Sequence, residues 1–303
     1  MSTPYTRNPL MQGFTEGYFV ANDGVKLRYL HKGSGMPLIF VPPFGGMADV
    51  YALNAPAFTD DFSVYVLEMR GHGFSDAPAH GAHVFRLSAD LHEFIESLNA
   101  PKVNLIGWSM GCAVIWGYIE LFGQDKINKL VFDDQPPFVS ANPYDSKEEI
   151  LQYSGNRIDI WHVHHVYSRN FDDGWPVLKT YFQRPEIPLT PEISASLPDN
   201  YAEKMALMPE SLKVDKARGQ FLADLVRDHL WLDYRGIFPL IKVPVLYLIG
   251  DISNCTTPEC GDWISKTIPN CKLVRFTAEE FGGHDLNQTA YKKFNDSVME
   301  FLK

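Results

Sequence analysis

Residues 103–111 read Val-Asn-Leu-Ile-Gly-Trp-Ser-Met-Gly, and no other segment is as informative about the fold. Val103–Ile106 is a short, largely apolar run typical of a buried strand, and Met110–Phe122 has apolar residues at helical spacing. The turn between them matches G-x-S-x-G, in which a serine sits on a sharp turn and flanking glycines leave room for the neighbouring strand and helix. The helix N-terminus also favours developing negative charge. We therefore predict that Ser109 is a nucleophile; a serine that only caps the helix is the alternative.

Outside this stretch, short apolar runs alternate with helical patterns. Apolar runs without polar alternation are typical of strands buried on both faces of a parallel sheet. A turn at residues 22–24 also indicates an initial strand pair. We therefore predict an α/β fold with a doubly wound, mostly parallel sheet. The predicted strands are Tyr18–Val20, Val25–Leu30, Leu38–Val41, Val64–Leu67, Val103–Ile106, Leu130–Phe132, Val243–Ile249 and Leu273–Phe276, and the predicted helices are Phe85–Leu98, Met110–Phe122 and Ala290–Leu302.

Composition excludes several functional classes. The 303 residues are 45% hydrophobic and 21% charged, as in ordinary globular proteins. The net charge is −10 and no basic cluster occurs, so nucleic acid is not an expected partner. The longest apolar runs hold about seven residues, whereas a membrane span needs roughly 20, so no membrane segment is expected. The first residues do not resemble a signal peptide, and we expect a cytoplasmic monomer or homodimer.

The four cysteines show neither a C-x-x-C pair nor zinc spacing, so we expect reduced thiols. Cys255 and Cys260 lie close enough in sequence to pair if oxidised, but cytosolic disulfides are rare. His162, His164 and His165 lack the spacing and the carboxylate of a metal site, and no metal is expected.

One region interrupts the alternation of strand and helix. Residues 138–235 contain no convincing buried strand, and a structureless loop of that length is implausible. We predict a helical lid at 138–235 inserted into a core made of 1–137 and 236–303. Aromatic residues make up 13% of the chain. Trp108, Trp161 and Trp175 are candidates for lining a pocket for a small hydrophobic substrate, although core packing is the alternative for each.

Four motifs in order resemble the α/β-hydrolase superfamily: Pro42–Gly46, Arg70–Ser75, Gly107–Gly111 and Gly282–His284. The resemblance covers nearly all of the chain outside the insertion. It implies that His284 is the base that activates Ser109. It also implies an oxyanion hole made by the backbone N–H groups of Met110 and Phe44, since Pro42 and Pro43 have no N–H. We expect no cofactor.

The acid partner of His284 departs from the commonest pattern. Many members carry it in a Gly-x-x-Asp loop after the seventh strand, but here that loop reads Gly250-Asp251-Ile252-Ser253. A serine does not stabilise an imidazolium as a carboxylate does. The other known location follows the sixth strand, where Asp133 and Asp134 stand. We predict Asp134 as the acid and keep Asp251, and then Asp133, as alternatives.

These residues predict a serine hydrolase that cleaves a carboxylic ester or lactone of a hydrophobic molecule. Two alternatives remain on the same fold: a cofactor-independent dioxygenase, in which the histidine–aspartate pair deprotonates the substrate, and a non-catalytic small-molecule receptor. A dehalogenase is disfavoured, because its nucleophile is an aspartate and Ser109 occupies that position.

Overall fold

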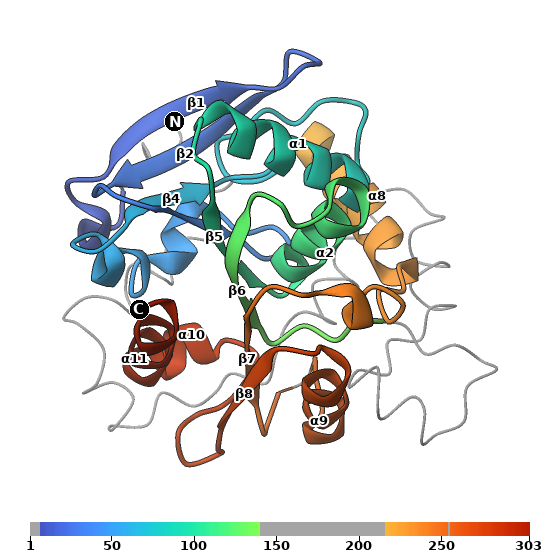
Figure 1. Ribbon diagram of the computed structural model, residues 1–303. Helices are drawn as coiled ribbons and strands as arrows, with labels where there is room; N and C mark the ends of the chain where they lie inside the picture. Colours follow the sequence, from blue (N-terminus) through green and yellow to red (C-terminus); the bar gives the residue numbers. More distant parts are fainter. Residues whose placement is uncertain (1–6, 140–215, 254) are drawn as a thin grey trace.

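The computed structural model describes residues 7–139, 216–253 and 255–303, and an eight-stranded sheet forms the centre of this part of the chain (Figure 1). The strand order is β1-β2-β4-β3-β5-β6-β7-β8. β2 is antiparallel to β1 and β4, and the other neighbours are parallel. The predicted mostly parallel α/β sheet is therefore confirmed. The strands are β1 Thr15–Val20, β2 Lys26–Lys32, β3 Pro37–Val41, β4 Ser63–Leu67, β5 Val103–Trp108, β6 Ile127–Asp133, β7 Val245–Gly250 and β8 Cys271–Phe276.

Helices cover both faces of the sheet (Figure 1). One hydrophobic cluster lies between the sheet and α1, α2, α8 and α9, and a second lies between the sheet and η1, η2, η3, α10 and α11. The helices are α1 Val84–Ser97, α2 Met110–Phe122, α8 Lys216–Trp231, α9 Pro258–Thr267, α10 Leu286–Thr289 and α11 Tyr291–Leu302, with 3-10 turns η1 Pro9–Met11, η2 Ala48–Tyr51, η3 Ala55–Phe58 and η4 Phe238–Leu240.

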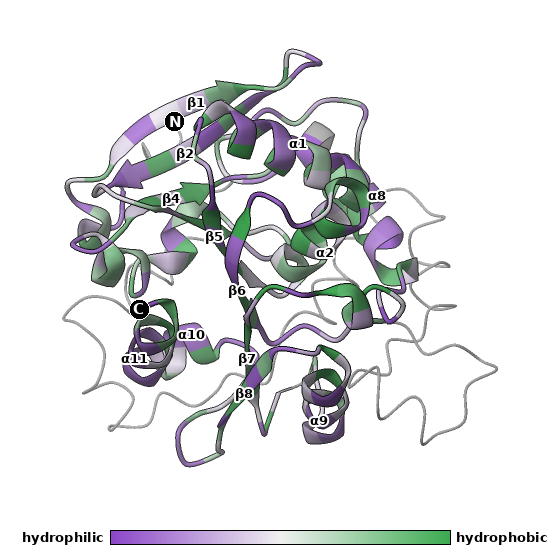
Figure 2. Cartoon of the chain, in the orientation of Figure 1, coloured by the Kyte–Doolittle hydropathy of each residue, from purple (hydrophilic) through white to green (hydrophobic). Residues whose placement is uncertain are grey.

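Burial explains why the central strands were recognisable in the sequence. Every residue of β5 and β7 is buried, and hydrophobic colour runs along the central strands in Figure 2. A strand covered on both faces has no solvent side, so it needs no polar alternation. β1, at the edge of the sheet, has no fully buried residue.

The strand order reverses beside β3, because β4 lies on one side of it and β5 on the other. In open α/β sheets, ligand sites form outside the carboxyl ends of the strands at such a point. The loop after β3 carries Phe44, and the turn after β5 carries Ser109. The topology therefore places both residues at the edge where a site is expected.

The sequence patterns missed helix α9. Its signal is local: Thr257 caps the helix by accepting a hydrogen bond from the Cys260 N–H at 3.1 Å, and Pro258 follows at the first helical position. Thr-Pro is therefore a start signal that apolar spacing alone does not reveal.

The two ends of the predicted insertion lie side by side. Phe138 forms an antiparallel bridge with Asp233, and the Tyr234 N–H donates to the Pro137 carbonyl at 2.9 Å. Within the insertion, α8 sends Phe221 into the main hydrophobic cluster. The rest of the predicted lid, with Trp161 and Trp175, lies outside the described residues, so the lid and its boundaries remain predictions.

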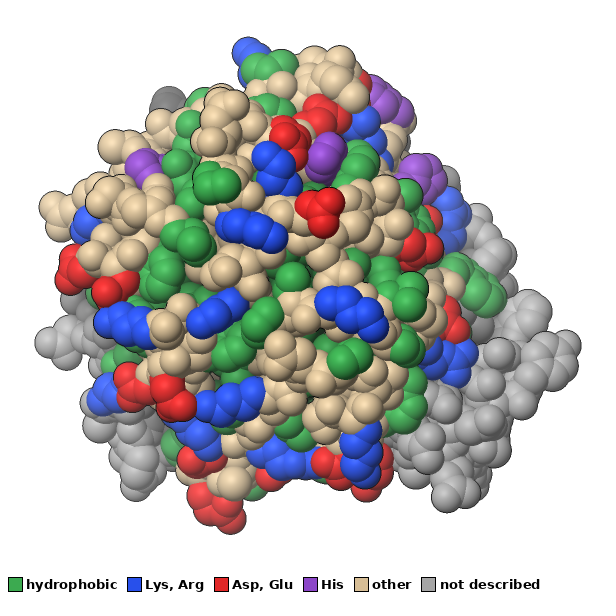
Figure 3. Space-filling model, in the orientation of Figure 1, with side chains coloured by type: hydrophobic (Ala, Val, Ile, Leu, Met, Phe, Trp, Pro, Cys, Tyr) green, Lys and Arg blue, Asp and Glu red, His purple; other side chains and the backbone are tan. Residues whose placement is uncertain are grey.

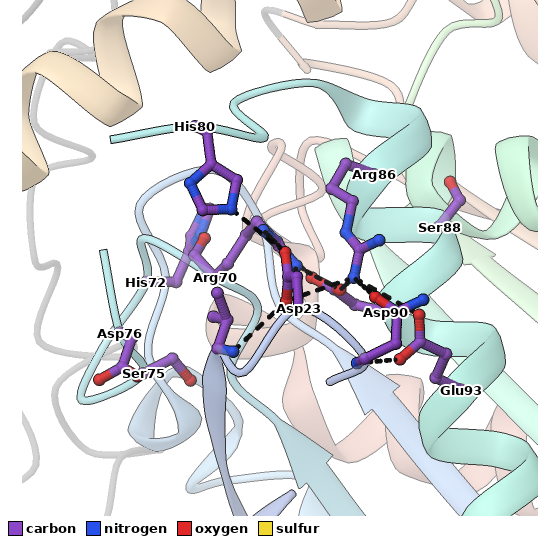
Figure 4. A network of polar contacts seen from close by, with 12 residues as sticks. Asp23, Arg70, His72, Ser75, Asp76, His80, Arg86, Ser88, Asp90 and Glu93 are labelled. Carbon is purple, nitrogen blue, oxygen red and sulfur yellow. Dashed lines mark hydrogen bonds and ion pairs between the residues drawn. The ribbon is translucent and has the colours of Figure 1, made fainter. Parts of the chain in front are cut away.

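A buried ion-pair network holds the loop after β4 (Figure 4). Arg70 is fully buried and donates to both carboxylate oxygens of Asp90 on α1, at 2.5 and 2.6 Å. Its other contact is Asp23, in the turn between β1 and β2, at 3.0 Å. Arg86 contacts Asp90 from α1 itself at 2.9 Å. The network joins three elements and fixes the path of the chain through the Arg70–Ser75 motif.

Among the described residues, no helix is both long and apolar enough to cross a bilayer. Basic and acidic side chains are interspersed over the face drawn in Figure 3. This face therefore carries no continuous area of one charge.

Candidate active site

Ser109 occupies a backbone conformation that a non-glycine residue rarely adopts. Its φ is 53° and its ψ is −128°, at the junction of β5 and α2. A Cβ on Gly111 would collide with the Val41 carbonyl, and a Cβ on Gly107 would approach the Cys112 nitrogen to 2.7 Å. The two glycines therefore let the turn pack against β3 and α2, and the predicted strand–turn–helix is confirmed.

His284 lies in the loop between β8 and α10 and is almost completely buried. Just before His284, the backbone at Gly282 packs directly against the backbone at Phe276. A Cβ on Gly282 would collide with the Phe276 carbonyl. The indole N–H of Trp108 donates to the His284 carbonyl at 2.8 Å. Because Trp108 directly precedes Ser109, this bond ties the histidine loop to the serine turn.

Asp134 is the carboxylate that meets His284. Its Oδ2 accepts a hydrogen bond from His284 Nδ1 at 2.6 Å, and Asp134 is fully buried. Asp251 instead pairs with Arg275 at 3.3 Å and is part-exposed. Asp133 ends β6, where its carbonyl accepts from the Ser109 N–H at 2.9 Å. Of the three candidate carboxylates, the structure therefore brings Asp134 to the histidine.

The buried pair stabilises the protonated histidine. Burial lowers the pKa of His284, but the neighbouring Cys255 and the hydrogen bond with Asp134 raise it, and the net pKa lies above the ordinary 6.5. The side chain of Cys255 is itself a hydrogen-bonding neighbour of His284. An imidazolium formed here is therefore held by two groups from different loops.

The candidate oxyanion donors lie at the ends of adjacent strands. Met110 is the first residue of α2, and the first N–H groups of a helix have no intrahelical acceptor. Phe44 lies in a tight turn after β3, closed by the Gly46 N–H donating to the Pro43 carbonyl at 2.9 Å. β3 pairs with β5 up to Val41 and Gly107, so the two segments leave the sheet side by side.

A family model for the alpha/beta hydrolase fold matches residues 36–288. The chain belongs to the α/β-hydrolase fold family. A putative non-heme chloroperoxidase from Synechocystis is 24% identical over 92% of this chain and 95% of that protein. The crystal structure of a bromoperoxidase from Bacillus anthracis has a TM-score of 0.76 at 22% identity, covering 96% of this chain and 99% of that one. An esterase from Exiguobacterium antarcticum has a TM-score of 0.73 at 21% identity, covering 94% and 98%.

Two aromatic residues of this α/β-hydrolase flank the candidate site. Trp108 is 6% exposed and packs its ring against that of His284, with centroids 6.0 Å apart. Phe44 is half-buried and meets the ring of His72 edge-on at 6.3 Å. The structure thus shows Trp108 as a packing residue that supports His284, while its contact with a substrate remains a prediction.

His72 belongs to the buried framework beside the site. It is buried, its Nδ1 bonds to the Arg70 carbonyl at 2.8 Å, and burial lowers its pKa to about 4. The imidazole is therefore neutral at physiological pH.

Sequence reasoning missed the residues that surround Asp134. Ser253 Oγ donates to Asp134 Oδ2 at 2.5 Å, and the Thr256 hydroxyl donates to Asp134 Oδ1. Ser253 stands where many family members carry the acid, and the sequence pattern there indicates only that the acid is missing. The signal available in the sequence was the pair of hydroxyl residues, Ser253 and Thr256, in the loop where the acid is expected but absent from its usual position.

Proposed function

We propose that the protein is a serine hydrolase that cleaves a carboxylic ester or lactone of a hydrophobic small molecule. The observation that carries the proposal is the buried His284–Asp134 pair at 2.6 Å, in a loop tied to the strained turn of Ser109. Family membership and the fold shared with a bacterial esterase support hydrolysis as the reaction class.

In the first step, Ser109 Oγ attacks the substrate carbonyl carbon and His284 takes its proton. Nδ1 of His284 is engaged by Asp134, which leaves Nε2 to act as the base. The step requires Nε2 to come within about 2.6–3.2 Å of Ser109 Oγ in the substrate complex. The N–H groups of Met110 and Phe44 hold the negative charge on the carbonyl oxygen.

In the second step, His284 returns the proton to the leaving oxygen as the carbon–oxygen bond breaks. Water then attacks the acyl-serine with His284 again as the base, and Ser109 recovers its proton. Asp134 keeps the imidazole oriented and stabilises its charged form throughout. No cofactor takes part in these steps. A hydrophobic substrate is proposed because the half-buried aromatic ring of Phe44 lies next to the proposed oxyanion donors, and apolar side chains line most sites for small apolar molecules.

A fluorophosphonate probe tests the nucleophile directly. Intact mass spectrometry should show one adduct on the wild type and none on Ser109→Ala, because the probe reacts with an activated serine. Turnover of p-nitrophenyl esters should be lost in the same variant. Labelling of Ser109→Ala at the wild-type rate would exclude the proposal.

The same preparations separate the two alternatives. Oxygen uptake with a quinolone that persists in Ser109→Ala would indicate a cofactor-independent dioxygenase. Ligand binding without probe labelling or turnover would indicate a receptor.

A further inference from the structure

The loop after β7 wraps around the carboxylate of Asp134. Asp134 Oδ2 accepts from His284 and from Ser253, and Oδ1 accepts from the Thr256 hydroxyl and, at 3.4 Å, from the Gly250 N–H. The loop residues lie more than 110 positions from Asp134 in the sequence. Each oxygen of a fully buried carboxylate thus has two donors. A buried charge requires such partners, because no water is present to solvate it.

The direction of the Ser253 hydroxyl is determined by its other contacts. Ser253 Oγ accepts the N–H of Cys255 at 3.0 Å and the N–H of Thr256 at 3.2 Å. A serine hydroxyl has two acceptor sites and one hydrogen, so both acceptor sites are occupied. Its single hydrogen is therefore available only for Asp134, at 2.5 Å.

We propose that Ser253 and Thr256 are positioning residues whose hydroxyl groups hold the Asp134 carboxylate in the orientation that His284 Nδ1 requires. The loop that lacks the acid thus supplies the two hydroxyls that hold the acid of the neighbouring strand. The kinetic consequence of this inference rests on the proposed function, but its spectroscopic consequence does not.

Other ionisable groups also lie near the His284–Asp134 pair. Cys255 contacts His284 from the loop after β7, which also carries Ser253 and Thr256. Burial, together with the nearby carboxylate, raises the pKa of the side chains of Tyr247 on β7, Cys112 on α2 and Cys260 on α9, so all three are neutral at working pH.

The first test uses no substrate. In the wild type, the proton shared by His284 Nδ1 and Asp134 should give one sharp, far-downfield resonance in the proton NMR spectrum. Thr256→Val keeps the shape of the side chain but removes the donor, and Ser253→Ala removes the donor to the other oxygen. Both variants should broaden or lose the resonance, because the carboxylate is no longer held.

The matched variants separate the hydroxyl from its packing. Thr256→Ser restores a hydroxyl with a smaller side chain and should retain the resonance. Thr257→Val removes a neighbouring hydroxyl that caps α9, and it should lower stability without changing the resonance. Should Thr256→Val not fold, Ser253→Ala makes the same test at a half-buried position.

Kinetics provide the second readout. Each donor deletion should lower kcat on the order of 10-fold with little change in KM, because the pair matters most when the imidazolium forms. The proposal would be overturned if Thr256→Val and Ser253→Ala both kept the wild-type resonance and the wild-type kcat. Equal losses in Thr256→Ser and Thr256→Val would overturn it as well. If the variants lose the resonance but the wild type hydrolyses no ester, the positioning role of the two hydroxyls is supported and the proposed function is rejected.

Discussion

At the scale of single residues, backbone conformation separates the candidate site from ordinary loops. Ser109 and Asp134 are two of only four non-glycine residues with positive φ among those described, at 53° and 48°. Such conformations cost of order 1–3 kcal/mol and persist only where the surroundings enforce them. In Ser109 the enforcing contacts are the strand pairing on one side and α2 on the other. In Asp134 the N–H is held by the Leu248 carbonyl of β7 at 3.0 Å.

The contrast between Asp134 and Asp251 gives the first prediction. Asp134→Asn should lower kcat by about 10⁴, because an amide can neither fix the histidine tautomer nor stabilise the imidazolium. Asp251→Asn should keep most of the activity, since it only loses an ion pair with Arg275. Ester hydrolysis measured on both variants, with thermal melting to verify folding, checks the ranking. The reverse ranking would assign the acid to the β7 loop.

The pH dependence of activity follows from the raised pKa of His284. A general base works only when neutral, so kcat/KM should rise with pH to a midpoint above 6.5. Cys255→Ala removes one group that raises the pKa, so its midpoint should move to lower pH. A pH–rate profile of both proteins checks this, and a midpoint that is unchanged or higher in the variant would contradict it.

The same pKa has a consequence for stability. The folded pKa of His284 lies above its unfolded value, so its contribution to the free energy of unfolding is complete below pH 6.5 and is lost as pH rises through the folded pKa. Activity and this part of the stability should therefore change in opposite directions with pH.

At the scale of elements, the ends of β6 and β7 converge on one histidine. The two strands are paired through Asp133 and Leu248, so the next residues of each leave the sheet together. Ser253 Oγ and His284 Nδ1 both contact Asp134 Oδ2, at 2.5 and 2.6 Å. A carboxylate on the loop after β6 or on the loop after β7 is therefore expected to reach His284 Nδ1.

This convergence predicts that the acid can be moved. Asp134→Asn combined with Ser253→Asp should recover at least 10-fold of the activity lost in Asp134→Asn alone, which is about 1.4 kcal/mol of barrier. Steady-state hydrolysis of the same ester measures the recovery, and Asp134→Asn with Ser253→Ala is the matched control. A double variant no more active than that control would show that position 253 does not reach His284.

At the scale of the whole molecule, buried polar contacts join elements that are distant in sequence. Arg70 and Asp90 are both fully buried and lie 2.5 Å apart, whereas Asp23, the other partner of Arg70, is 24% exposed. Removing one member of a buried pair leaves an uncompensated charge, which costs far more than losing an exposed contact. The framework around the site therefore depends on a few such pairs.

Asp90→Asn should accordingly lower the free energy of unfolding by about 3–5 kcal/mol. Asp23→Asn removes a carboxylate from the same arginine at a partly exposed position, and it should cost less than about 1 kcal/mol. Urea unfolding followed by circular dichroism compares the two. Equal costs would show that the burial of Asp90 does not control the stability of the network.

The strands and the serine turn were predictable from residue patterns, and the place of His284 in the chain from the resemblance to the α/β-hydrolases. These features are local: a strand buried on both faces is a continuous apolar run, and a serine turn packed this closely needs glycines at 107 and 111. Helix α9 was not predicted because its start is marked by a capping residue, Thr257, and not by apolar residues at helical spacing.

The carboxylate that meets the histidine, and the groups that hold it there, became known from the three-dimensional contacts. Asp134 and His284 are separated by 150 residues, and Ser253 and Asp134 by 119. The pattern of residues ranked Asp134 above Asp251 without deciding between them, because contacts over such separations depend on strand register and on the left-handed turn at Asp134. The hydrogen bonds from Ser253 and Thr256 to Asp134 were not predicted for the same reason. The sequence does not show which group a serine hydroxyl will meet when the ends of two strands come together.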